Sequence, residues 1–264
     1  MTDTTNPSAS PLSSALSKVP AVTLAFWVAK ILATTVGETG GDALSMSLNL
    51  GYLVSTIIFL VFFAITLALQ MSAKRYHAAI YWAVVVATTT VGTTTSDYLD
   101  RTLGLGYVKS SILLFTLVLV VLIAWKFTTG AIRADQIHTR PDELFYWLTI
   151  LVSNTLGTAL GDFTSSDTGL GFEHSALLFA GLIVIVAALH FFTKISGSVL
   201  FWAAYILTRP LGATLGDTLT KPRDEGGFNL SRIASSLVIL AAMIIVIAVT
   251  SLRKRDQDHV TSPI

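Results

Sequence analysis

The sequence of 264 residues contains no cysteine, which excludes disulfides, thiolate metal sites and thiol catalysis. Charged residues are also scarce: they make up 12% of the chain, against about 25% in an average soluble protein. The net charge is +1, and no clustered basic face suggests a nucleic-acid partner. Apolar residues dominate instead, at 53% of the chain with a mean hydropathy of +0.70. This composition places the chain in the membrane class.

Apolar runs indicate helices that cross a bilayer. A span needs roughly 20 apolar residues, and fewer when neighbouring helices shelter it. Five clear apolar runs and three further apolar stretches between them predict an all-α polytopic membrane protein of about eight transmembrane helices. The five runs are residues 51–70, 112–127, 175–192, 198–207 and 235–252, and the further stretches are residues 20–36, 78–91 and 145–156.

Polar segments flank this apolar region. Residues 1–17 are rich in Ser, Thr and Pro, which is typical of a disordered tail, and their order of polar and apolar parts does not fit a cleaved signal peptide. Residues 253–264 are predicted to form a cytoplasmic C-terminal tail. Residues 18–252 are then a single transmembrane domain.

One pattern, anchored on tryptophan, occurs four times in register. A glycine follows each tryptophan after ten residues, an aspartate after fifteen, and a glycine with an aromatic neighbour after 24 or 25. The tryptophans are expected to be interfacial anchors or packing residues. The repeat units are residues 20–72, 76–127, 141–194 and 196–252; the tryptophans are Trp27, Trp82, Trp147 and Trp202; the aspartates are Asp42, Asp97, Asp162 and Asp217.

Each unit contains two spans, so all four units enter the membrane from the same side. They are therefore parallel repeats about an axis along the membrane normal, and the four aspartates lie at similar depth. Lys and Arg in the short loops are more frequent on the side of the termini, which predicts that both termini are cytoplasmic.

The first span of each unit ends in two small residues four apart, directly before the aspartate. Residues four apart share a helix face, and small residues there let helix backbones approach closely. Four helices packed through these faces would bring the four carboxylates toward a common axis. The pairs are Gly37/Gly41, Gly92/Ser96, Gly157/Gly161 and Gly212/Gly216.

The four aspartates are candidate metal ligands. Carboxylates held close together must protonate or bind cations. Oxygen ligands without cysteine suit ions such as Mg²⁺, Mn²⁺ or Ca²⁺ better than Cu or Zn. Further acids and oxygen donors on the same side extend the candidate site. They are Glu38, Asp100, Asn154 and Asp167, a set of threonines that includes Thr34, Thr89, Thr93 and Thr158, and more weakly His174 beside Glu173.

A structural role for the same aspartates stays open. An aspartate after a glycine can cap the next short helix or organise a turn, so the four copies could be four inherited caps. About nine residues such as 163–171 follow each aspartate, and their composition does not favour continuous helix. These segments would either dip back into the membrane to cover the axis or form an exterior cap.

Two basic residues lie within predicted spans. An ionisable residue inside the membrane is a functional candidate by default, so Lys30 is interpreted as a counter-ion to an acid or as a side chain that reaches toward an interface. Arg209 replaces the Asn154 position in the fourth unit and is expected to pair with a neighbouring aspartate.

The repeated stretches resemble a known family. The segments "TVGETGGD", "GTTTSDYLDRTLGLGY", "NTLGTALGDF" and "TRPLGATLGDTLTKP" are similar to a widespread bacterial family of uncharacterised, repeat-containing membrane-anchored proteins, over nearly all of residues 20–252. The second unit departs from the pattern with Ser96 before Asp97. The resemblance implies the multi-span repeat architecture and a bacterial inner membrane.

The sequence thus predicts a transporter of a divalent metal cation of the Mn²⁺ or Mg²⁺ type, which we expect to be an exporter that exchanges the ion for protons. Its expected partners are the lipid bilayer, the metal ion as substrate and a second copy of the chain, with no tightly bound cofactor. The sequence lacks nucleotide-binding, nucleophile-elbow and zinc-protease motifs, so an enzyme is not expected. The alternatives are a monovalent cation channel with an acidic vestibule and a non-transporting membrane scaffold.

Overall fold

The computed structural model describes residues 20–130, 132, 137 and 139–260, and the predicted tail at residues 1–17 lies outside this range. All regular structure in the described residues is helical, which confirms the predicted all-α class. Short π-helices η1 (Ala43–Ser47), η2 (Tyr98–Thr102) and η3 (Phe163–Asp167) and the 3-10 helix η4 (Arg223–Glu225) accompany eight long helices. The long helices are α2 (Leu24–Asp42), α3 (Gly51–Ser72), α4 (Ala78–Asp97), α5 (Tyr107–Thr129), α6 (Arg140–Asp162), α7 (Gly171–Phe192), α8 (Gly197–Thr220) and α9 (Arg232–Val260).

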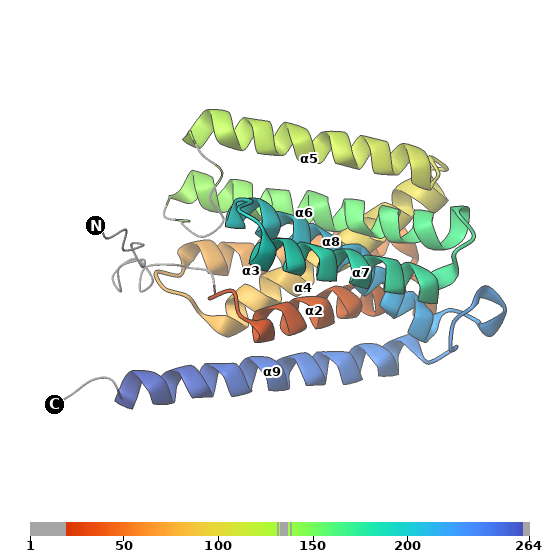
Figure 1. The fold of residues 1–264 in the computed structure, drawn as a ribbon. Helices are drawn as coiled ribbons and strands as arrows, with labels where there is room; N and C mark the ends of the chain where they lie inside the picture. Colours follow the sequence, from red (N-terminus) through yellow and green to blue (C-terminus); the bar gives the residue numbers. More distant parts are fainter. Residues whose placement is uncertain (1–19, 131, 133–136, 138, 261–264) are drawn as a thin grey trace.

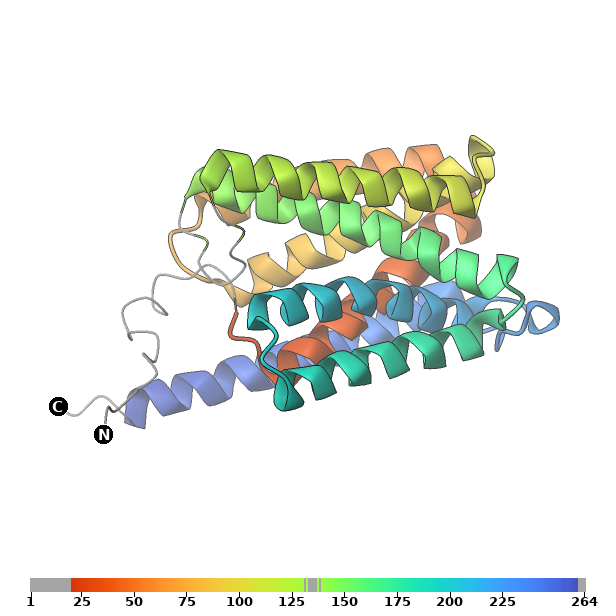
Figure 2. The same cartoon turned by 45° about the horizontal axis from the view of Figure 1, so that its top comes forward.

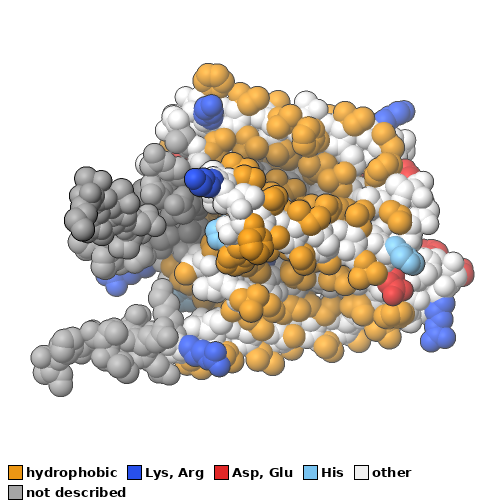
Figure 3. All heavy atoms as spheres, viewed as in Figure 1, with side chains coloured by type: hydrophobic (Ala, Val, Ile, Leu, Met, Phe, Trp, Pro, Cys, Tyr) orange, Lys and Arg blue, Asp and Glu red, His pale blue; other side chains and the backbone are white. Residues whose placement is uncertain are grey.

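Seven of the long helices are long and apolar enough to cross a membrane. The remaining one, α2, carries Lys30, Glu38 and Asp42, which lower its mean hydropathy. It nevertheless lies inside the bundle beside the others (Figure 1). Apolar side chains cover the flanks of the molecule, and the charged side chains gather at its two ends (Figure 3). This distribution fits a chain that passes through a bilayer several times.

The first helices of the four repeats form a closed inner ring. Helix α2 packs against α4 and α8, and α6 also packs against α4 and α8 (Figures 1 and 2). All four run in the same direction, as parallel repeats require. The start of α2 and the end of α9 consequently lie at the same end of the bundle (Figure 1).

The second helices form an outer layer that is shifted by one repeat. Helix α3 packs on α4, α5 on α6 and α7 on α8, and α9 of the last repeat packs on α2 of the first. Between 61% and 72% of the residues in the α4, α6 and α8 spans are buried, against 6% to 28% in the outer spans. The outer helices therefore present most of their surface to lipid, and the fourth repeat closes the ring by covering the first.

Glycines lie at the four contacts of the inner ring. Gly37 on α2 faces Thr89 on α4, and the equivalent glycine of each later repeat faces the next inner helix in the same way. An added Cβ at any of these positions would overlap the facing residue. The other three contacts are Gly92 with Asn154 and Thr155, Gly157 with Arg209, and Gly212 with Thr34. The later glycines Gly41, Gly161 and Gly216 face Thr93, Ala213 and Glu38.

The predicted break in the helix directly after the aspartates is wrong for the first three repeats. There the chain continues for five residues as η1, η2 and η3, whose wider turns keep the backbone hydrogen-bonded, for example from Leu48 N–H to the Ala43 carbonyl. The reversal follows at Asn49, Gly104 and Gly169, which all have φ between 54° and 74°. Only glycine or asparagine readily adopts that backbone conformation.

The repeated tryptophans belong to an aromatic layer at the end of the bundle opposite the aspartates. Trp82 and Trp147 are buried, and the hydroxyls of the neighbouring Tyr81 and Tyr146 lie 2.9 Å apart. The tryptophans were expected to be interfacial anchors or packing residues, and Trp82 and Trp147 are packing residues.

Candidate cation-binding site

The four repeated aspartates, which we call the acid ring, lie at the C-terminal ends of the four inner helices. Asp42, Asp97 and Asp162 are the last residues of α2, α4 and α6, and Asp217 lies in the last turn of α8. Each is at most 2% exposed. Four carboxylates buried at one end of the bundle repel one another, so this end favours cations.

Two basic side chains each bridge two members of the acid ring. The Arg101 guanidinium lies 3.0 Å from Asp97 Oδ1 and 3.8 Å from Asp162 Oδ2. The Lys221 ammonium lies 3.2 Å from both Asp217 Oδ1 and Asp42 Oδ2. Arg101 and Lys221 both follow the tryptophan of their repeat by nineteen residues, in repeats two and four. The acid ring therefore consists of two pairs, each bridged by one base.

A second buried ion pair lies deeper in the bundle, one helical turn from Asp42. Arg209 is fully buried, and its Nη2 donates to Glu38 Oε2 at 3.0 Å. The same nitrogen also donates to the hydroxyls of Thr93 and Thr158. The expected pairing of Arg209 with an aspartate is wrong, because Arg209 lies one turn below the acid ring, level with Glu38.

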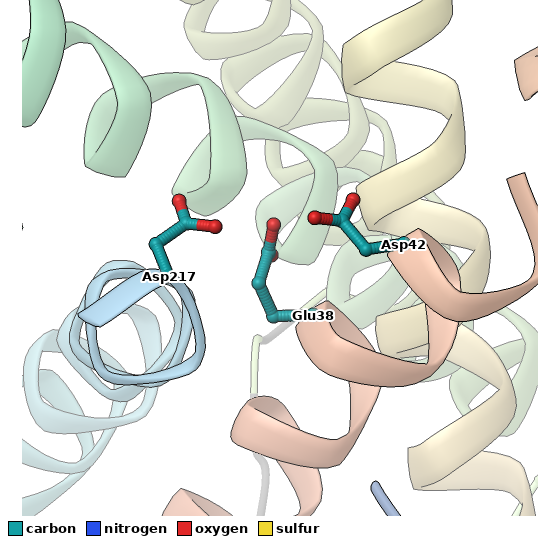
Figure 4. Close-up of side chains that lie close together, drawn as sticks. All are labelled: Glu38, Asp42 and Asp217. Carbon is teal, nitrogen blue, oxygen red and sulfur yellow. The ribbon is translucent and has the colours of Figure 1, made fainter. Parts of the chain in front are cut away.

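Three carboxylates converge where α8 meets α2. Glu38, Asp42 and Asp217, the carboxylate triad, each offer one oxygen, and these oxygens all lie within 4.8 Å of one another (Figure 4). Asp42 Oδ1 is buried and has no hydrogen-bond partner among the described residues. Hard divalent cations take this kind of all-oxygen ligand set.

The charges at this end nearly balance. Five carboxylates, the acid ring and Glu38, contact four cationic side chains. With every carboxylate ionised, one negative charge remains. The four cationic side chains are Arg101, Arg209, Lys221 and Arg232, the last of which lies 3.6 Å from Asp42 Oδ2.

Lys221 remains charged in this environment. Burial alone would lower the pKa of its amine, but the adjacent Asp217 and Asp42 carboxylates raise that pKa well above its ordinary value. A protonated amine is therefore the resident cation between these two acids.

Several predicted ligands lie outside the carboxylate triad. Asn154 is one layer deeper, where it donates to Thr88 and lies 3.5 Å from the Lys30 ammonium. Asp100 lies on η2 and accepts a hydrogen bond from the Ser96 hydroxyl at 3.3 Å. Asp167 and His174 are exposed near the reversal of the third repeat. These four residues lie outside the triad, as do Asp97 and Asp162, and their role as metal ligands stays a prediction.

Lys30 has no carboxylate within ion-pair distance in the described part of the chain. Its fully buried ammonium lies 4.2 Å from the centre of the Tyr205 ring and contacts the Asn154 amide oxygen instead. Neither the expected acid partner nor an interface is within its reach. An aromatic ring and an amide oxygen are the groups that surround this amine.

The sequence analysis missed the bases of the acid ring, although a signal was present. Arg101 and Lys221 each follow an aspartate by four residues, a spacing that places opposite charges on one helix face. Arg232 gave no comparable signal, because it reaches Asp42 only through the packing of α9 on α2.

Comparison with known proteins supports the repeat organisation. A model of a repeat of unknown function, DUF347, matches four times, at residues 25–76, 80–131, 145–196 and 200–256. Comparisons with curated proteins and with solved structures find no match. Each matched copy contains one inner and one outer helix of the ring, and the predicted resemblance to an uncharacterised repeat family is confirmed. Because the four copies cover most of its length, the chain belongs to the DUF347 repeat family.

Proposed function

We propose that the protein transports a divalent metal cation of the Mn²⁺ or Mg²⁺ type across a bacterial inner membrane, with the carboxylate triad as the ion's binding site. The observation that carries the proposal is the convergence of the Glu38, Asp42 and Asp217 oxygens within 4.8 Å, together with the unpartnered Asp42 Oδ1. Oxygen-only ligands favour such ions over copper or zinc.

Exchange with protons follows from the same chemistry. Two carboxylates that contact each other cannot both stay ionised without a cation nearby, so protons and metal ions compete for them. A pH gradient could therefore drive metal in the opposite direction. We propose export, with both termini in the cytoplasm.

The packing of the bundle axis argues against an open channel. Arg209 and Lys30 are fully buried side chains that face the other inner helices, and the Tyr205 ring lies against Lys30. An ion passing along the axis would have to displace two buried basic side chains. Transport through alternating conformations fits this arrangement better than continuous conduction.

A scaffold is the second candidate, because Arg101 and Lys221 already neutralise most of the acid ring. If the acids serve only to hold helices together, their neutral amide variants should retain function. Asp→Asn variants therefore separate the two proposals.

Asp42→Asn/Asp217→Asn is expected to lower Mn²⁺ uptake into proteoliposomes, measured with and without a pH gradient, on the order of 100-fold, because two ligand charges next to the ion are lost. Asp167→Asn is the matched control: its carboxylate is exposed outside the triad, and its uptake should equal that of the wild type. Equal uptake by the double variant and the wild type would contradict the proposed site.

A further inference from the structure

Lys221 occupies the space that a bound cation would need. Its Nζ lies 3.2 Å from Asp42 Oδ2 and 3.2 Å from Asp217 Oδ1, and both acids belong to the carboxylate triad. The side chain is only 6% exposed, so bulk water has little access to it there. A metal ion held by the same oxygens and the Lys221 ammonium therefore exclude each other.

The net charge of the site depends on whether Lys221 is in place. With all five carboxylates ionised and Lys221 in place, the four cationic side chains leave one negative charge. Withdrawal of Lys221 leaves two negative charges, which a divalent cation neutralises and a monovalent cation does not. Exchanging the Lys221 ammonium for a divalent cation therefore keeps the net charge of the buried site close to zero. Uncompensated charge in a buried site is costly.

The segment that carries Lys221 differs from the equivalent segments of the other repeats. Helix α8 has no π-helix directly after it, and residues 218–230, which begin with the last three residues of α8, form a hairpin at the right end of the bundle in Figure 1. Backbone N–H groups of Phe228 and Asn229 donate to the carbonyls of Thr218 and Lys221 at 2.7 and 2.9 Å. Residues 223–226 at its tip are exposed. The hairpin is therefore fixed to the bundle at its buried base, beside Lys221 and Gly227, and not at its tip.

Arg101, the equivalent base of the second repeat, is 31% exposed but has three side-chain partners against two for Lys221. It lies on η2, which continues α4 without a break, and its guanidinium also donates to the Tyr52 hydroxyl at 3.4 Å. A guanidinium offers several donors in fixed geometry, whereas an ammonium is a compact point charge on a flexible stem. The two bases are therefore suited to different tasks: Arg101 fixes Asp97 and Asp162, and Lys221 can be displaced.

We infer that Lys221 is a built-in competitor of the transported ion, which occupies the carboxylate triad when the ion is absent and leaves with the 218–230 hairpin when the ion binds. The inference rests on the proposed function, because it takes the triad as the ion site. It adds the residue that sets the affinity and the charge selectivity of that site.

The first test is equilibrium binding of Mn²⁺ to the full chain in lipid nanodiscs at pH 8. Lys221→Gln is expected to bind about tenfold more tightly than the wild type, equivalent to about 1.4 kcal/mol. Arg223→Gln removes the same charge from the exposed tip of the same hairpin, and its affinity should stay within about twofold of the wild type, since an exposed charge is screened.

If the wild type binds Mn²⁺ and Lys221→Gln binds it equally well or more weakly, the inference is overturned and the proposed function still stands. Absence of saturable Mn²⁺ binding in both proteins would overturn the two together. Lys221→Arg provides the opposite change: a base with more donors should be harder to displace, so Mn²⁺ should bind more weakly than to the wild type.

The second test follows the amine itself. An amine-reactive reagent, read out by mass spectrometry of the Lys221 peptide, should label the buried wild-type lysine slowly and severalfold faster at saturating Mn²⁺. Asp42→Asn/Asp217→Asn should lose this response to Mn²⁺. Labelling that is the same with and without the ion in the wild type would show that Lys221 is only a structural cation and would overturn the inference.

Discussion

Arg209→Met should destabilise the protein by about 3–5 kcal/mol, because it leaves the Glu38 carboxylate buried without its partner. Arg209 is fully buried, and its Nη2 also donates to Thr93 and Thr158, which would lose that donor. The measurement is unfolding in mixed micelles followed by tryptophan fluorescence.

The control is Arg209→Met/Glu38→Gln. Replacing both members of a buried pair costs much less than removing one, so the double variant should recover most of the lost free energy of unfolding. If the double variant loses as much free energy of unfolding as Arg209→Met and Glu38→Gln lose in sum, the two residues do not act as a pair.

Gly212→Leu is the second change with a large expected effect, because Gly212 closes the ring between α8 and α2. An added Cβ there would overlap the side chain and backbone of Thr34. One extra methylene in a packed interior already costs about 1–3 kcal/mol, and leucine adds four carbon atoms. We expect little folded monomer by size-exclusion chromatography with fluorescence detection.

Gly181→Leu on α7 is the matched control for this experiment. No atom of the described residues lies within 4 Å of a Cβ added at Gly181, and leucine favours helix more than glycine does. This variant should elute like the wild type. Gly212→Leu protein that folds as well as Gly181→Leu protein would contradict the closed ring.

The repeat pattern was enough to predict the architecture. Tryptophan, glycine and aspartate recur at fixed spacing, and two spans per unit require parallel units, so the aspartates had to lie at one end. The sequence could not show how the units pair, because each apolar face fits more than one neighbour. The structure places α3 on α4 of the next repeat and α9 on α2 of the first.

This pairing explains what the sequence analysis missed in the site. Glu38 and Arg209 are 171 residues apart and meet only because the fourth inner helix packs against the first. Lys221 reaches Asp42 through the same closure. Asp97 and Asp217 did carry a local signal, since a base follows each of them by four residues. Asp167 and His174 were expected near the site because they follow Asp162 on the same side of the membrane, and both are exposed in the structure.

Anomalous diffraction at the manganese absorption edge, from crystals grown with Mn²⁺, tests the central claim most directly. The account predicts one strong peak per chain, within bonding distance of oxygens of Glu38, Asp42 and Asp217, with the Lys221 amine moved away from it. Peaks confined to exposed carboxylates such as Asp167, or no peak beside an unchanged Lys221, would contradict it.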